Sequence, residues 1–245
     1  MLERNQDTLA KLTVGYKKFR EGFFSQNTEI FKNLATQGQK PKIMFISCSD
    51  SRVNTTTIMS CEPAEIFKVK NVANLVPSYF DKLKNMEIGA ALEFAVRHLQ
   101  VQHIIVMGHS GCGGIKALLE SDTAEPGVKP PTTESGFIKN WVQIAKEARD
   151  KTLNKSKDLS SDERAKFCEE QALLVSMRNL ETYPWIQLKI KAGELFLHAW
   201  RFDIGHGLIQ CYNPNSKIFE ELKSTDLGQN EDSARAPHHQ LRSKL

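Results

Sequence analysis

The sequence predicts an α/β fold: a mostly parallel central sheet flanked by helices, with a C-terminal antiparallel hairpin strand. Short apolar runs alternate with longer amphipathic segments along most of the chain, which is typical of parallel strands connected by helices. The runs at 43–46 and 103–107 are continuously apolar, as expected for strands that are buried on both faces. Residues 195–201 alternate instead, and turn residues at 203–207 lead to a partner strand at 208–212.

The remaining elements follow in order along the chain. Residues 8–24 carry apolar side chains at helical spacing and predict the first helix. A second strand of the sheet is expected at 66–69. Further helices are predicted at 54–60, 86–99, 112–119, 137–149 and 162–180. The prolines between 121 and 135 predict a loop, and Pro184 is expected to stop the last of these helices.

The composition excludes several classes of protein. With 40% hydrophobic and 25% charged residues over 245 positions, the chain resembles an average soluble globular protein. No apolar run approaches the roughly 20 residues that a membrane-spanning helix needs, so we expect no membrane partner. The net charge of +4 is modest, and no Lys/Arg run is interleaved with aromatic residues. We therefore expect no nucleic-acid partner.

The cysteines indicate a reducing compartment. Their number, five, is odd, and they are widely spaced, which argues against a disulfide framework. The first residues of the chain include acids and no apolar segment, so no secretory signal is visible. We therefore expect a cytoplasmic protein.

Two short segments that follow predicted strands carry metal-binding chemistry: residues 48–52 (CSDSR) and residues 109–114 (HSGCGG). Within them, Cys48, His109 and Cys112 offer two thiolates and one imidazole. A structural zinc site uses four protein ligands, whereas a catalytic zinc keeps one position open. Because the carboxyl ends of parallel strands meet at one edge of a sheet, the three side chains can converge. The sequence therefore predicts a zinc site with an open position.

Asp50 and Arg52 lie beside the first of these ligands. Two thiolates and a neutral imidazole cancel the charge of Zn²⁺, so such a zinc is a weaker Lewis acid than one held by three imidazoles. Asp50 can accept a hydrogen bond from a zinc-bound hydroxide, and Arg52 can clamp Asp50 through a bidentate pair. Alternatively, Asp50 coordinates zinc directly as a fourth ligand and closes the site. The residue types permit both arrangements.

Three parts of the chain are expected. A helical arm spans 1–38, an α/β zinc-binding catalytic domain spans 39–223, and a polar segment at 224–245 without apolar periodicity predicts a disordered tail. The arm has apolar faces but precedes the compact sheet unit. We therefore expect the N-terminal helices to pack on a partner subunit.

The chain resembles the β-class carbonic anhydrases from about residue 39 to residue 212. Besides the two zinc motifs, the resemblance rests on NVANLVP at 71–77, ALEFAV at 91–96 and LHAW at 197–200. It implies zinc-dependent, reversible hydration of CO₂ to bicarbonate and a proton, by a zinc-bound hydroxide that an Asp–Arg dyad orients. It also implies a homodimer or a higher even oligomer, with the active site at the subunit interface.

The resemblance assigns roles to individual residues. Cys48, His109 and Cys112 are implied to be the zinc ligands, Asp50 and Arg52 the catalytic dyad, and the backbone N–H of Gly113 a contact for the substrate oxygen. This family has a bicarbonate-inhibited type of site that is closed. In that type, Trp lies three residues before the first ligand and Gly lies immediately before it. This chain has Phe45 and Ser47 there.

The plant-like type, with an open site, has Gln nine residues before the first ligand and Phe in the second strand, which correspond to Gln39 and Phe67. We therefore expect an open site in which Gln39 donates to CO₂ or bicarbonate. The pocket would combine Gln39 and Phe67 of one chain with the zinc of the other. Two positions depart from the family: Lys70 replaces its usual Arg, and Phe94 replaces its usual Tyr.

Two other functions are compatible with the sequence. CS₂ or COS hydrolysis uses similarly linear substrates on the same fold. A catalytically silent scaffold, in which zinc only supports folding, is the second alternative. The presence of Asp50 and Arg52 argues against the scaffold, because a structural zinc site needs neither.

Overall fold

The computed structural model describes residues 2–81, 86–121, 136–155 and 159–223. Its contacts divide the chain into two compact units, Met1–Lys40 and Pro41–Leu245. The predicted tail and most of the predicted loop at 121–135 lie outside the described residues.

The first unit is helical. Helix α1 (Leu2–Lys18) continues as a π-helical segment, η1 (Phe19–Phe24), and α2 (Thr28–Gln37) follows after a short turn. The predicted helix at 8–24 is confirmed, and α2 lies within the predicted helical arm at 1–38, although its bounds were not predicted. Four phenylalanine rings hold the turn together, with centroids 5.0–6.3 Å apart: Phe19, Phe23, Phe24 and Phe31.

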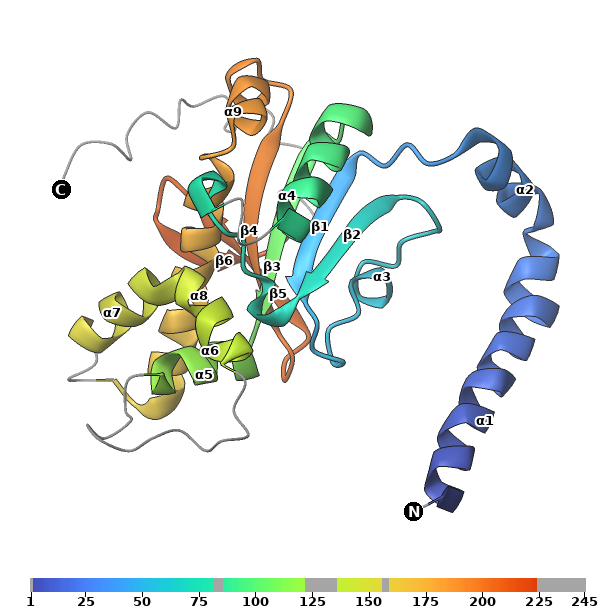
Figure 1. Ribbon diagram of the computed structural model, residues 1–245, viewed down its shortest axis with the longest axis horizontal. Coiled ribbons are helices and arrows are strands. Elements are labelled where there is room, and N and C mark those ends of the chain that lie inside the picture. The colour runs from blue at the N-terminus through green and yellow to red at the C-terminus, as the bar shows by residue number, and fades with distance from the viewer. Residues whose placement is uncertain (1, 82–85, 122–135, 156–158, 224–245) are drawn as a thin grey trace. The chain divides into compact units, whose positions relative to one another are not determined.

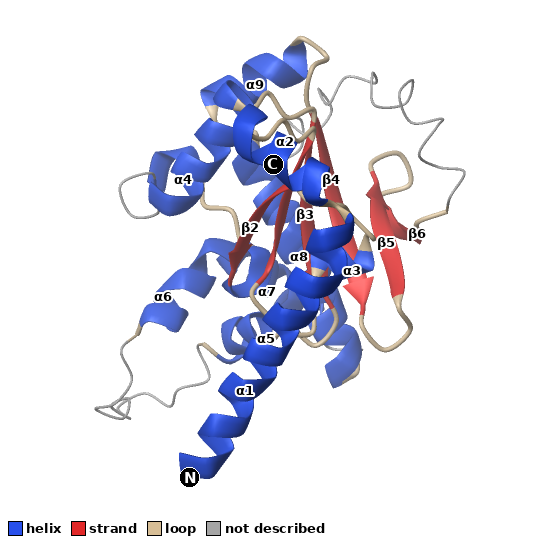
Figure 2. Cartoon of the chain, turned by 90° about the vertical axis from the view of Figure 1, so that its right-hand side faces the viewer, coloured by secondary structure: helices blue, strands red, loops and turns tan. Residues whose placement is uncertain are grey.

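The second unit is built on a six-stranded sheet of order β2-β1-β3-β4-β5-β6 (Figure 1). Its strands are β1 (Ile43–Cys48), β2 (Ile66–Asn71), β3 (His103–His109), β4 (Phe196–Asp203), β5 (Leu208–Asn213) and β6 (Ile218–Glu221). Strands β2, β1, β3 and β4 are parallel, whereas β5 and β6 pair antiparallel at one edge (Figure 2). The predicted mixed α/β fold is confirmed, and β6 is an additional strand.

Helices connect and cover the strands. They are α3 (Thr55–Ile58), α4 (Met86–Glu93), α5 (Gly113–Glu120), α6 (Phe137–Val142), α7 (Lys146–Lys155), α8 (Ser161–Leu180) and α9 (Pro184–Lys191). A π-helical segment, η4 (Phe94–His98), continues α4, and short 3₁₀ segments lie at η2 (Val72–Asn74), η3 (Tyr79–Asp81) and η5 (Gln143–Ala145). The segment η5 divides the predicted helix at 137–149 into α6 and α7.

Pro184 acts differently from the prediction. Helix α8 ends at Leu180, before the proline, and Pro184 is the first residue of α9. Proline favours the first turn of a helix because its fixed φ suits that position and its missing N–H would have no partner there. The prediction that this proline only stops a helix was therefore incomplete.

Alternation within the buried strands explains their continuous apolar runs. Met44 and Ile104 belong to a core cluster with side chains of α4, α8 and α9. Phe45 and Ile105, the next residues in the same strands, belong to a second cluster on the opposite face, with Val53. Successive side chains of a strand point to opposite faces, so a strand covered on both sides has no polar face. Packing on both faces therefore fixes the positions of the ends of β1 and β3.

Candidate metal centre

The sheet brings the first two predicted ligands to the same edge. Strands β1 and β3 are parallel neighbours, and Ser47 pairs with Met107 in their register. Cys48 and His109 therefore lie at or just beyond the last pair, at the carboxyl ends of both strands. The chain then turns at Gly111, whose φ of +66° favours glycine, and Cys112 caps the start of α5.

The three donor groups form a compact, buried cluster. One donor atom from each of Cys48, His109 and Cys112 lies within 4.8 Å of the other two, and all three residues are buried. The two sulfur atoms are 4.0 Å apart. Two thiolates on a tetrahedral zinc, with Zn–S distances of about 2.3 Å, would be separated by about 3.8 Å. The cluster therefore has the spacing that a zinc ion requires.

The orientation of the imidazole also fits a metal ligand. His109 Nδ1 lies 3.0 Å from the carbonyl oxygen of Ser110. A carbonyl oxygen only accepts, so Nδ1 carries the proton and donates it. In the neutral imidazole, the form that binds a metal, this leaves a lone pair on Nε2, and Nε2 is buried without a hydrogen-bond partner among the described residues. A second contact that fixes the tautomer of a ligating histidine is common in metal sites.

In the metal-free chain, the contact between the two thiols shifts the pKa values of Cys48 and Cys112 in opposite directions. The hydrogen bond from Cys112 lowers the pKa of Cys48 to about 4. The same contact, with burial, raises the pKa of Cys112. Burial lowers the pKa of His109, but contact with the Cys48 thiolate outweighs this effect and raises it. Metal binding at this cluster therefore displaces protons.

Asp50 and Arg52 form a bidentate pair beside the cluster. Arg52 Nε donates to Asp50 Oδ1 at 3.0 Å and Nη2 donates to Oδ2 at 2.7 Å, while the Arg52 backbone N–H adds a contact of 2.9 Å to Oδ1. Asp50 Oδ2 lies 3.8 Å from His109 Nε2. The hydrogen bonds from Arg52 hold the pKa of Asp50 well below its usual range, so the carboxyl group is ionised.

The segment η2 packs tightly on the third glycine of the HSGCGG motif, Gly114. A Cβ on Gly114 would lie 2.9 Å from both Ala73 Cβ and Val72 Cγ1. Ala73 and Asn74 hold positive φ angles of 62° and 49°. Trp141 of α6 fixes this turn by donating from Nε1 to the carbonyl of Val72 at 2.7 Å. The NVANLVP motif therefore braces the start of α5.

Of the three predicted substrate contacts, Gly113 lies next to the cluster and Phe67 lies apart from it. Gly113 is the first residue of α5, directly after Cys112. Phe67 pairs with Met44 in β1, four residues before Cys48, which is a separation of about 13 Å along a strand. Gln39 belongs to the first unit, whose placement relative to the sheet is not determined.

The two departures from the family have identifiable contacts. Lys70 Nζ donates to the carbonyl of Val53 at 2.5 Å, which ties β2 to the loop that follows Arg52. Phe94 packs its ring 5.8 Å from that of Phe67. Lysine at position 70 thus makes one point contact with the backbone rather than a planar fork.

Sequence reasoning missed two buried charges behind the cluster. Glu169 of α8 and Arg201 of β4 are each about 4% exposed and pair with one another. Neither belongs to the motifs described above, and Glu169 precedes another glutamate in a helix with many charged residues. The only available signal was a charged residue, Arg201, inside an alternating strand.

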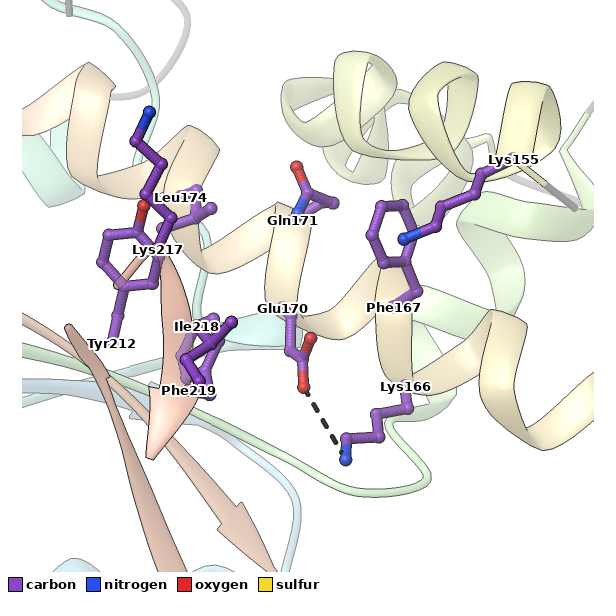
Figure 3. Close-up of a pocket in the computed structure, with 10 residues that line it drawn as sticks. All are labelled: Lys155, Lys166, Phe167, Glu170, Gln171, Leu174, Tyr212, Lys217, Ile218 and Phe219. Atoms are coloured by element: carbon purple, nitrogen blue, oxygen red, sulfur yellow. Dashed lines mark ion pairs between the residues drawn. The ribbon is translucent and has the colours of Figure 1, made fainter. Parts of the chain in front are cut away.

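A pocket of about 340 Å³ lies elsewhere, where α8 faces β5 and β6. Lys155, Phe167 and Tyr212 are among the residues that line it (Figure 3). No residue of the metal cluster contributes to its walls. None of the described helices has the length and apolar character to cross a membrane.

Comparisons with known proteins agree with this site. The sequence profile of the family described as carbonic anhydrase matches residues 43–209. β carbonic anhydrase 3 of Arabidopsis thaliana is 35% identical over 211 residues, which cover 86% of this chain and 79% of the relative. A carbonic anhydrase of Synechocystis sp. is 34% identical over 205 residues, with 84% and 71% coverage.

Solved structures show the same relationship. The β-carbonic anhydrase CcaA superposes with a TM-score of 0.81 at 32% identity, covering 89% of this chain and 93% of that chain. A tetrameric β-carbonic anhydrase from the ascomycete Sordaria macrospora gives a TM-score of 0.72 at 28% identity, with 84% and 96% coverage. The chain therefore belongs to the β carbonic anhydrase family, the enzymes that hydrate carbon dioxide.

Proposed function

We propose that the chain is a zinc enzyme that hydrates CO₂ reversibly, with Cys48, His109 and Cys112 as the metal ligands and Asp50 with Arg52 as the catalytic dyad. The observation that carries this proposal is the buried donor set, in which the lone pair of His109 Nε2 and two sulfur atoms converge. Two thiolates and one imidazole suit zinc, and three protein ligands are the number found in catalytic sites. Zinc bound there would supply a Lewis acid that makes water a nucleophile at neutral pH.

Asp50 orients the attacking water in this proposal. Its carboxylate is ionised, and an ionised carboxylate only accepts hydrogen bonds. It therefore holds a water molecule by a proton and leaves the oxygen lone pair directed at the carbon of CO₂. Arg52 occupies both carboxylate oxygens and keeps them aligned. Each carboxylate oxygen has a second lone pair, so Oδ2 accepts from Arg52 and can still accept from the water. Zinc content and catalysis of Asp50→Asn distinguish this role from that of a fourth metal ligand.

The substrate pocket is proposed to be completed by a second subunit. Phe67 lies about 13 Å along the strands from Cys48, too far to touch a substrate at the same cluster. A partner's copy of Phe67 and of Gln39 meets this need, with Gln39 donating to a substrate oxygen. The backbone N–H of Gly113 is free of the internal helical bonds, as at any helix start, and is available to the other oxygen.

Assembly as a homodimer or a higher even oligomer is part of the proposal. Helix α1 exposes more than half of four apolar side chains: Leu9, Leu12, Val14 and Tyr16. Leu9, Leu12 and Tyr16 lie on one side of the helix, and exposed apolar side chains gathered in this way commonly mark an interface. The tetrameric Sordaria macrospora enzyme shows that relatives of this fold assemble.

We also propose a cytoplasmic location, which keeps both ligand thiols reduced. Two relatives from Arabidopsis thaliana are named as mitochondrial and chloroplastic, so the location of this chain needs its own test. Fractionation of cells that produce the full chain tests this point, and recovery with an organelle would contradict it.

The function is tested by measuring zinc content together with CO₂ hydration in a stopped-flow assay. We expect about one zinc per chain and rapid hydration that is lost when zinc is removed and regained when it is restored. Assays with CS₂ and COS in parallel distinguish the alternative substrates. A zinc-loaded protein that hydrates no CO₂ would contradict the proposal and favour the scaffold.

A further inference from the structure

In the buried ion pair behind the cluster, both carboxylate oxygens of Glu169 accept hydrogen bonds. Glu169 Oε2 accepts from Arg201 Nε at 3.1 Å and from Nη2 at 2.9 Å. Glu169 Oε1 accepts from the backbone N–H of Gly111 at 2.8 Å and of Cys112 at 3.3 Å. Burying two charges is costly and does not by itself stabilise a fold, so this pair calls for another role.

The N–H groups that Glu169 holds belong to the turn that carries a metal ligand. This turn lies between the end of β3 and the start of α5. Glu169 therefore holds the backbone N–H of Cys112, the residue whose thiol contacts Cys48. The anchor itself is rigid: α8 begins with a capping box in which Ser160 and Glu163 satisfy each other's backbone N–H groups.

A single peptide plane connects Glu169 to the dyad. The N–H of Cys112 and the carbonyl of Gly111 belong to the same peptide unit, which is trans. The N–H is held by Glu169, and the carbonyl accepts from Arg52 Nη2 at 3.2 Å. Because a peptide unit is planar, tilting the N–H moves the carbonyl as well. The guanidinium of Arg52 also holds Asp50.

We propose that Glu169, braced by Arg201, is a positioning residue: it sets the Gly111–Cys112 peptide plane, and through this plane it aligns Arg52 and presents Cys112 to the metal. The part that concerns Arg52 rests on the dyad proposed above. Glu169 contacts neither substrate nor metal in this role. It acts through one rigid peptide unit on two functional groups at once.

The first test is a double-mutant cycle in kcat/KM, measured with saturating zinc. Glu169→Gln keeps the size of the side chain but replaces one oxygen, which accepts hydrogen bonds, by an NH₂ group, which donates them. We expect a loss of roughly 10- to 100-fold, mainly in kcat. Arg52→Ala removes the group that the peptide plane aligns. In that background we expect Glu169→Gln to cost less than about threefold more, since the two residues act along one path.

The second readout is metal affinity, measured by competition with a chelator. Glu169→Gln should bind zinc roughly tenfold more weakly, because the backbone of Cys112 loses an anchor. Arg52→Ala should keep the parent affinity. Glu170→Gln is the matched control: it is the same substitution one residue along α8, where the side chain pairs with Lys166 in the separate pocket (Figure 3). It should keep parent activity and affinity.

The outcomes are distinguishable. If Glu169→Gln costs the same factor with and without Arg52 and leaves zinc affinity unchanged, Glu169 has only a general structural role and the proposal is overturned. If Arg52→Ala alone leaves kcat/KM at the parent value, the dyad itself is wrong, and the coupling to Arg52 is overturned with it. Should Glu169→Gln not fold, Arg201→Lys keeps the positive charge, loses the fork, and enters the same cycle.

Discussion

At the scale of single residues, the metal site depends on three donors, Cys48, His109 and Cys112. In Cys48→Ser a hydroxyl, which does not ionise near neutral pH, replaces a thiolate. We expect loss of zinc and of CO₂ hydration, measured by metal analysis and stopped flow. Cys61→Ser is the matched control, because Cys61 is half-buried and its sulfur lies near the Met59 carbonyl rather than in the cluster. A Cys48→Ser enzyme with full zinc and full activity would disprove the ligand assignment.

Proton competition gives a second prediction at this scale. The pKa values of Cys112 and His109 are raised in the metal-free chain, so both groups hold protons more tightly than usual. Zinc requires the deprotonated forms, and its affinity should therefore fall as the pH is lowered through the neutral range. Chelator competition at several pH values measures this. An affinity that stays constant from about pH 8 to about pH 6 would contradict it.

The sequence motifs were enough to predict the metal ligands, but not the residue that positions one of them. Cys48, His109 and Cys112 were predictable because their types and their places after apolar strands restrict the possible chemistry. Glu169 was not, because nothing in an isolated helix sequence tells which of two adjacent glutamates is buried against a loop. Burial is decided by α8 crossing the sheet, which is a property of the whole fold.

At the scale of elements, the close contact between η2 and α5 predicts a sensitivity to size. In Gly114→Ala the new Cβ would lie 2.9 Å from Ala73 Cβ, and relief requires moving a turn that already holds positive φ angles. We expect a loss of about 1–3 kcal/mol in the free energy of unfolding, from denaturant titration. For Gly113→Ala, where the Cβ would meet no atom within 4 Å, stability should not fall. Equal effects of the two substitutions would contradict the packing argument.

The elements themselves were predicted unevenly, for physical reasons. Continuous apolar runs made β1 and β3 recognisable. The edge strand β6 has only four residues, three of them exposed and two of them glutamates, so its sequence differs little from that of a loop. Helix α9 was hidden because Pro184 was read as a stop, although proline also suits the first turn of a helix.

At the scale of the whole molecule, the apolar face of α1 predicts that oligomer and activity are lost together. Replacing Leu9 and Leu12 by Glu places charges on a face that is now exposed and apolar. We expect a shift towards monomer in sedimentation velocity and a fall in kcat/KM, because the partner's Gln39 and Phe67 would leave the pocket. Lys11→Glu, a charge change on the same helix outside the apolar set, is the control. A fully active monomer at assay concentration would contradict this assembly.

The most direct test of the central claim is the zinc content and kcat/KM of Asp50→Asn between about pH 6.5 and pH 9. In the parent enzyme, hydration should rise with pH over this range. The substitution keeps the shape but removes the charge and weakens the acceptor, so we expect a loss of about 2–4 kcal/mol in transition-state stabilisation, or roughly 30- to 900-fold in rate. Zinc content should stay near the parent value, because Cys48, His109 and Cys112 remain. Intact zinc with unchanged catalysis would contradict a catalytic role for Asp50. Weakened zinc binding would also contradict the account, because it would indicate that Asp50 is a fourth metal ligand.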